Sequence, residues 1–239
     1  MNMPSEESRQ PPAAPRGIAL SGILFSILFT SSLVLLRLAV PADPTDSGAW
    51  LASPRFRQLV GISLNLVPFA GIAFLWFMGV LRNLVGPLED RFFATVFLGS
   101  GFLFVAMLFA AAGIARSLLD SFSTALPGHS ETYRFGREAA YVLMNTFGMR
   151  MAAVFMFVTS TICLRTGVLS RPVSQTGFAC GVLLLLGITV VPWVGLIFPL
   201  WVLLVSISML LTPPVQRCTL NGERTEFSNS PPSIQDQPR

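Results

Sequence analysis

The chain has 239 residues, of which 52% are hydrophobic and only 12% are charged, and its mean hydropathy is +0.65. Soluble domains carry about 25% charged residues, so this composition excludes an ordinary soluble protein and indicates a membrane protein. The net charge of +4 comes from arginines that lie singly between apolar stretches. This pattern argues against a nucleic-acid-binding surface and favours charges that set membrane topology.

The first predicted element is a disordered tail, because residues 1–16 are rich in Pro and Ser and lack apolar periodicity. Residues 213–239 have the same character, which leaves 17–212 as a transmembrane domain. Residues 17–36 are charge-free and match the roughly 20 residues that a membrane-spanning helix needs. This apolar stretch is longer than a signal peptide usually has, so we expect an uncleaved span, with cleavage near the small residues at 40–42 as the alternative.

Three further stretches predict membrane-spanning helices because each holds more than 20 residues with almost no charge. The third of them is interrupted by one arginine, Arg150. The stretches are 58–81, 92–115 and 139–164.

The last charge-free stretch, residues 172–216, is too long for one span. It holds 45 residues, which as a single helix would measure about 67 Å, or about twice a bilayer. Pro192 and Gly195 lie near its middle and favour a turn. We therefore predict two helices, near 174–190 and 195–212, joined by a hairpin. The alternative is one long kinked helix, which would give five spans in place of six.

The fold class predicted from these elements is all-α, a polytopic bundle of six transmembrane helices. Helices satisfy their backbone hydrogen bonds internally in lipid, and the long non-alternating stretches exclude a β-barrel. With the N-terminus in the cytoplasm, inner segments carry nine arginines and outer loops carry six, which agrees with the positive-inside rule. The inner ones are Arg9, Arg16, Arg82, Arg91, Arg165, Arg171, Arg217, Arg224 and Arg239, and the outer ones are Arg37, Arg55, Arg57, Arg116, Arg134 and Arg137.

The polar residues within the spans define a candidate site. Arg150 has no carboxylate in any span with which to pair, so it needs other acceptors. Asn65 offers one, and Pro68 frees the carbonyl of Leu64 four residues before it. The side chain of Arg150 leans toward the N-terminus of its helix, so we predict a hydrogen bond to the Asn65 patch, with Thr146 helping. The alternative is that Arg150 snorkels to the outer headgroups.

Small residues at helical spacing form a second set of candidates. Gly177 and Gly181 lie four apart, and Gly99 and Gly101 lie in the third predicted span. In lipid, small residues let helix backbones approach closely. We expect these positions to mediate packing within the chain, with a homodimer face as the alternative.

Beyond the third span, the segment 116–137 is predicted to lie outside the membrane. Leu118, Leu119 and Phe122 are spaced as on one helix face, before a break at Pro127 and Gly128. We expect the third helix to continue as an amphipathic turn at the membrane interface, with a plain flexible loop as the alternative.

One stretch resembles a known group of proteins. The segment "NLVPFAGIAFLWFMG" at 65–79, followed by "EDRFFATVFLGSGFLF" from Glu89, is similar to small, uncharacterised multi-span membrane proteins of actinobacteria. The similarity is strongest over residues 65–106. It implies a bacterial inner-membrane protein with an all-helical fold, and it implies no catalytic residues.

The sequence contains no motif of a catalytic, cofactor or metal site. The cysteines show no CxxC spacing, and His129 is the single histidine. We therefore expect no catalytic residues, no cofactor and no metal. The first hypothesis is an integral membrane protein with a non-enzymatic structural or interaction role in the inner (plasma) membrane. Its expected partners are the lipid bilayer and either itself or another membrane protein, with no nucleic acid.

The alternative function is a small-solute transporter or channel with a polar site around Arg150 and Asn65. The chain shows no internal repeat and no carboxylate at mid-membrane depth, which are the usual signs of a coupled transporter. A membrane enzyme is the weakest hypothesis because the spans contain almost no titratable groups.

The six-span topology predicts that both termini lie in the cytoplasm. A reporter that fluoresces only in the cytoplasm, fused after Arg239, should be bright, and alkaline phosphatase fused at the same point should be inactive. An active phosphatase with a dark fluorescent fusion would contradict this topology.

Overall fold

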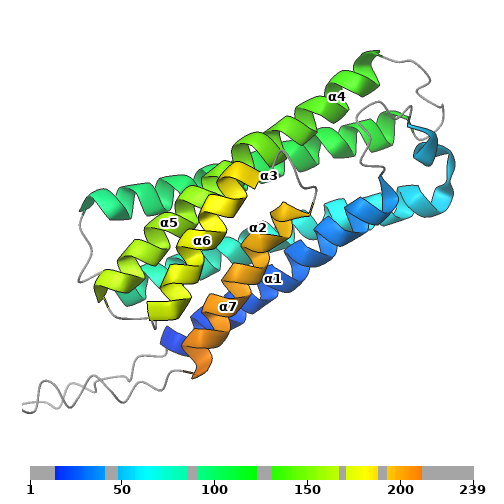
Figure 1. Ribbon diagram of the computed structural model, residues 1–239. Helices are drawn as coiled ribbons and strands as arrows, with labels where there is room; N and C mark the ends of the chain where they lie inside the picture. Colours follow the sequence, from blue (N-terminus) through cyan, green and yellow to red (C-terminus); the bar gives the residue numbers. More distant parts are fainter. Residues whose placement is uncertain are drawn as a thin grey trace, which may run out of the picture.

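The computed structural model describes residues 14–40, 48–85, 91–122, 131–166, 171–187 and 193–211. Over these ranges the chain is helical apart from short connections (Figure 1). The helices are α1 (Ala14–Ala39), η1 (Ala49–Ala52), α2 (Pro54–Val85), α3 (Arg91–Ser121), α4 (Glu131–Tyr141), η3 (Val142–Gly148), α5 (Met149–Thr166), α6 (Arg171–Gly187), η4 (Val194–Leu196) and α7 (Ile197–Leu211). The predicted C-terminal tail, 213–239, and residues 1–13 of the predicted N-terminal tail lie outside the described residues.

The predicted all-α bundle is confirmed. Because α4, η3 and α5 follow one another without a break, they form one rod, and the described residues contain six helical rods in all. Five of them are long and apolar enough to cross a membrane, whereas α6 has only 17 residues, or about 26 Å. The long charge-free stretches of the sequence therefore correspond to these rods.

The last two rods form a hairpin, so the alternative of one kinked helix over 174–212 is wrong. α6 and α7 run in opposite directions side by side (Figure 1). α6 ends at Gly187, and Gly195 lies in the short 3-10 turn that leads into α7. Pro192, predicted to mark the bend, lies outside the described residues.

The six rods form a closed ring in the order α1, α2, α3, α5, α6 and α7, with α7 packed against α1. An even number of rods returns the chain to its starting end, so α1 begins and α7 ends at the same end of the bundle (Figure 1). We call this the terminal end. The opposite end, which carries η1 and α4, is called the cap end.

The centre of the ring is filled by phenylalanine side chains. Phe74 of α2 lies 5.0–5.7 Å, centroid to centroid, from one phenylalanine ring on each of four other rods. Edge-to-face and tilted rings at such distances attract each other beyond the effect of their buried area. The four partners are Phe25 of α1, Phe104 of α3, Phe155 of α5 and Phe198 of α7, and all five rings are 0% exposed.

Serine hydroxyls tie α1 to its neighbours. Ser32 of α1 and Ser63 of α2 each donate to the other's backbone carbonyl, at 3.0 and 2.8 Å. Ser26 donates across to the carbonyl of Pro199 in α7, at 2.8 Å. Because lipid offers no hydrophobic drive for helices to associate, such bonds and close van der Waals contact hold them together.

The cap end has a small apolar cluster of its own. Leu119 of α3, Leu51 of η1 and Tyr133 of α4 are each at most 8% exposed and pack together there. The indole of Trp50 donates to the hydroxyl of Tyr133 at 3.0 Å. The cluster therefore fastens η1 and α4 to the ends of α1, α2 and α3.

The prediction for 116–137 holds in part. α3 continues to Ser121, as expected, but Leu118, Leu119 and Phe122 pack against other parts of the protein at the cap end. The ring of Phe122 lies 5.8 Å from that of Tyr133, and Leu118 contacts Gly136 of α4. Pro127 and Gly128 lie outside the described residues.

The central ring cluster generates a stability prediction. Replacing Phe74 with alanine removes contacts with four other rods, and we expect it to lower the free energy of unfolding in detergent by about 3 kcal/mol. We take the low end of the range measured for Phe→Ala, because the phenylalanine side chain enters the core from an environment of lipid and not of water. The control is Phe69→Ala on the same helix, where the side chain is 62% exposed and little change is expected. Equal losses in the two variants would contradict the central role of Phe74.

Candidate functional site

Arg150 follows a change of helix type within the fourth rod. Val142–Gly148 is a π-helix, in which the Met149 N–H bonds to the carbonyl of Met144, five residues back. Single π turns within α-helices occur often at functional sites. The guanidinium of Arg150 donates to the carbonyl of Thr146 at 2.9 Å. It thus reaches back one turn toward the N-terminus, as predicted, but to the backbone of Thr146 and not to its hydroxyl.

The depth of Arg150 follows from helix geometry. Fifteen residues separate it from Arg165, which is exposed near the end of α5. That separation is about 22 Å along the helix, so with Arg165 at the terminal-end surface of a core about 30 Å thick, Arg150 would lie about 8 Å below the opposite surface. A long arginine side chain that leans toward this surface can reach the headgroup layer. This placement is compatible with the snorkelling alternative, which stays a prediction.

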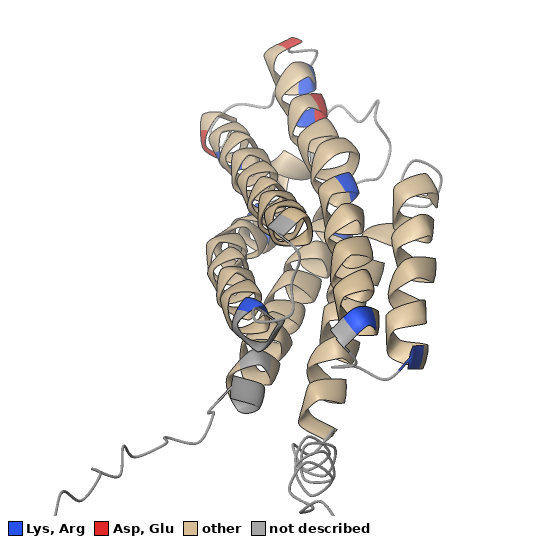
Figure 2. Ribbon diagram, turned by 90° about the vertical axis from the view of Figure 1, so that its left-hand side faces the viewer, with Lys and Arg blue, Asp and Glu red and all other residues tan. Residues whose placement is uncertain are grey.

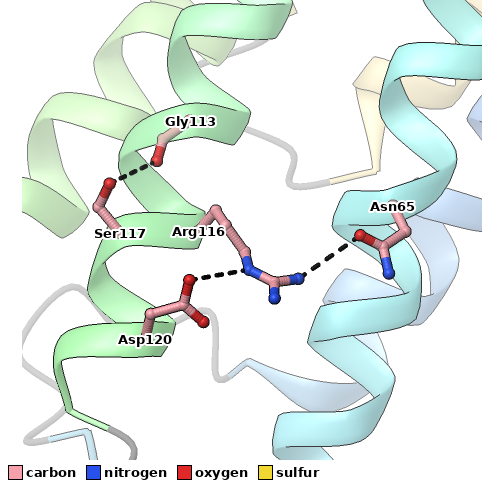
Figure 3. A network of polar contacts seen from close by, with 5 residues as sticks. All are labelled: Asn65, Gly113, Arg116, Ser117 and Asp120. Carbon is pink, nitrogen blue, oxygen red and sulfur yellow. Dashed lines mark hydrogen bonds and ion pairs between the residues drawn. The ribbon is translucent and has the colours of Figure 1, made fainter.

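The predicted hydrogen bond between Arg150 and Asn65 is not formed. The side-chain carbonyl of Asn65 accepts instead from Arg116 of α3 at 3.5 Å (Figure 3). Asn65 and Pro68 are both exposed and belong to one outward stripe of α2, which continues through Phe69 and Ile72. The side chain of Asn65 points out of the bundle toward α3 (Figure 3).

Arg116 is the centre of a polar network that sequence reasoning missed. Its Nε donates to the carboxylate of Asp120 at 3.1 Å, and Ser117 donates to the carbonyl of Gly113 (Figure 3). The side chains of Arg116 and Asp120 are 47% and 61% exposed, so the ion pair is screened where it meets water. The i, i+4 spacing of an arginine and an aspartate was the available signal.

The charges of the described residues are segregated along the bundle. Their acidic residues, Asp120, Glu131 and Glu138, all lie at the cap end, and charged residues are concentrated toward the ends of the helices (Figure 2). The pair of Arg134 and Glu131 spans 3.7 Å on the exposed face of α4. The apolar middle separates two polar ends, as a bilayer requires.

The predicted small residues differ in what they contact. Gly177 and Gly181 lie on one buried face of α6, and a methyl group added to them would meet Ser160 and Phe157 of α5. A methyl group at Gly101 of α3 would meet Met78 of α2, whereas one at Gly99 would meet nothing within 4 Å. Three of the four positions therefore lie at contacts between rods of the same chain.

The chemistry available to these residues is limited. Among the described residues there is no group of three or more His, Cys, Asp or Glu side chains that could hold a metal ion. Cys163 is buried in the bundle and is 1% exposed. The structure brings together two sets of polar groups. Arg150 binds the carbonyl of Thr146, and Arg116 binds Asp120 and Asn65 in an exposed network. Both sets suit contacts with anions or lipid headgroups better than proton transfer.

No protein-family model, curated protein or solved structure matches this chain. The similarity to actinobacterial membrane proteins stays a prediction.

The observed pairing of Asn65 generates a test by double-mutant cycle. Asn65→Ala and Arg116→Ala should show coupling, with the double variant losing less stability in detergent than the two single losses summed. Asn65→Ala and Arg150→Ala should be additive, because the two residues share no contact. Coupling between Asn65 and Arg150 would contradict the structure.

Proposed function

We propose that this integral membrane protein has a non-enzymatic role, in which it packs within the bilayer and presents its cap end to a partner. The observation that carries the proposal is the closed centre of the bundle. Four phenylalanine rings from four other rods meet around Phe74, and all five rings are fully buried, so among the described residues no polar pathway runs along the axis there. A scaffold tolerates such a centre, whereas a channel does not.

The surface best suited to a partner is the outward face of α4. Arg134 and Glu138 are exposed there beside Phe135, whose side chain is 77% exposed. α4 lies before Arg150 on the same rod. According to the depth estimated above for Arg150, α4 therefore lies outside the hydrocarbon core. A large exposed aromatic among charges outside the core is typical of a contact surface. The partner is a second copy of the chain or another membrane protein.

We also propose the inner (plasma) membrane as the location, with the N-terminus in the cytoplasm. The support is the excess of arginine on the segments that the sequence predicts to be inside, nine against six.

Transport of a small solute is the second candidate, favoured by one observation. Arg150 has five N–H donors, and among the described residues the structure gives it one acceptor, beside a π-helical segment. An anion passing near the cap end would find these donors. The closed centre requires that any such pathway run elsewhere or open by movement of the rods.

A photo-crosslinking experiment in native membranes tests the proposed interaction. A crosslinking phenylalanine analogue in place of Phe135 should give one defined protein adduct. The control places the analogue at Phe102, a position in the middle of α3 that is 54% exposed, where only lipid is expected.

Flux through purified protein in liposomes separates the two candidate functions. We expect no movement of small anions above that of empty liposomes. Absence of a defined adduct at 135, together with flux that Arg150→Lys abolishes without loss of stability, would overturn the proposal in favour of transport.

A further inference from the structure

Two neighbouring rods of the bundle are shorter than the others. α6 holds 17 residues and the last rod, Val194–Leu211, holds 18, whereas α2 and α3 hold 32 and 31. A helix of 17 or 18 residues measures about 26–27 Å, which is less than a hydrocarbon core of about 30 Å. α4 extends beyond the ends of α6 and α7 (Figure 1). The bundle therefore has a step at the cap end, with the α6–α7 hairpin on its low side.

The start of α5 lies at the level of this step. A methyl group added to Gly187, at the end of α6, would lie 3.6 Å from Val194, and one added to Gly195 would lie 3.2 Å from the terminal methyl of Met149. The end of α6, the turn into α7 and the first residues of α5 are therefore neighbours. Arg150, the residue after Met149, lies beside the step.

A second estimate of depth agrees with the first. Arg171 is exposed at the start of α6, and Gly187 lies about 24 Å from it along the helix. With Arg171 at the terminal-end surface of a core about 30 Å thick, the end of α6 lies about 6 Å below the opposite surface. The depth estimated for Arg150 from α5 is about 8 Å, so both rods place the step just inside the core.

The side chain of Arg150 is on the α6 side of α5. Phe157 follows Arg150 by seven residues, close to two helical turns, so the two side chains share one face of α5. The ring of Phe157 packs against α6, where a methyl group added to Gly181 would lie 3.0 Å from it. Two turns nearer the cap end, at the level of Arg150, α6 has ended. The partly buried side chain of Arg150 thus lies above the end of a neighbouring helix.

The chemistry of this place selects an anion. The described residues give Arg150 one acceptor, the carbonyl of Thr146, and their ion pairs, at Arg116 and Arg134, do not include it. The end of α6 and the start of α7 carry opposite partial charges that oppose each other, so the net charge here comes from Arg150. A guanidinium presents a planar fork of donors that matches a phosphate group.

Trp193 lies in the same layer of the membrane. Its side chain is 51% exposed, and it directly precedes the 3-10 turn that begins at Val194. Tryptophan is enriched where hydrocarbon meets lipid headgroups. A helix shorter than the core thins the bilayer beside it. The phosphate groups of the leaflet at the cap end are therefore the anions within reach of Arg150.

We propose that the step beside the α6–α7 hairpin is a binding site for a phospholipid of the leaflet at the cap end, whose phosphate accepts hydrogen bonds from Arg150. The exposed indole of Trp193 lies in the same headgroup layer. The lipid supplies the charge that Arg150 lacks and covers the end of α6, where the bundle is thinner than the bilayer. The proposal requires neither a protein partner nor transport, so it does not rest on the proposed function.

Lipid binding to the purified protein in mild detergent tests the proposal. The probes are phosphatidylglycerol and a diacylglycerol with the same acyl chains, which lacks the phosphate. By native mass spectrometry, we expect Arg150→Gln to hold one phosphatidylglycerol fewer than the wild type, with binding at this site weakened about tenfold. Arg150→Lys should be intermediate, because lysine keeps the charge but not the fork. The control is Arg134→Gln on the exposed face of α4, which should bind as the wild type does.

Three outcomes of this experiment would overturn the proposal. The first is equal binding of phosphatidylglycerol by the wild type and Arg150→Gln. The second is a diacylglycerol that raises the melting temperature of the wild type as much as phosphatidylglycerol does, because the acyl chains alone would then explain binding. The third is inorganic phosphate that raises the melting temperature of the wild type but not of Arg150→Gln, because the site would then take a free anion.

A measurement in liposomes keeps the proposal testable if Arg150→Gln does not fold. Lipids that carry a nitroxide on the headgroup or near the end of an acyl chain quench nearby tryptophan fluorescence. The contribution of Trp193 is the difference between the wild type and Trp193→Phe. We expect stronger quenching of Trp193 by the headgroup nitroxide. Stronger quenching by the chain-end nitroxide would place the step in hydrocarbon, away from phosphate, and would overturn the proposal.

Discussion

The packing of aromatic rings around Phe74 is the interaction on which the rest of the structure depends. In water, burial of apolar surface alone would bring helices together, but lipid tails are as apolar as the side chains they replace. Association then rests on close contact and on geometry. Rings from α1, α3, α5 and α7 all meet the ring of Phe74, and this common contact sets which face each of these rods turns inward.

Small residues allow the rods to come close enough for this packing, and two seams of the ring use them differently. Where α1 meets α2, Ser32 and Ser63 exchange hydrogen bonds directly. Where α6 meets α5, Gly177 admits the Ser160 hydroxyl, which finds no direct partner. The first seam is joined by direct hydrogen bonds, whereas at the second a side chain of α5 fills the space that glycine leaves on α6.

The rods differ in length, and this difference gives the molecule two unlike ends. The helical stretch Glu131–Arg165 holds 35 residues, whereas α6 holds 17. The longer rods must extend beyond a core that about 20 residues cross. At the cap end their projections enclose the cluster of Leu119, Leu51 and Tyr133 and display α4. A bundle whose apolar middle is closed, and which carries an additional polar helix at one end, is more typical of a protein that contacts a partner than of a channel.

The amino-acid sequence by itself determined the class, the number of rods and the final hairpin. Charge-free stretches are visible in the sequence, and the thickness of a bilayer sets the length that a spanning helix needs. For this reason 58–81 and 92–115 could be predicted as helices, and they lie within α2 and α3. The faces of the rods were decided by tertiary structure alone. In a soluble helix the apolar stripe marks the core, but here lipid-facing Phe69 and core-facing Phe74 are equally apolar. Rotation about each axis follows from ring packing, and for that reason Asn65 lies beside Arg116 and away from Arg150.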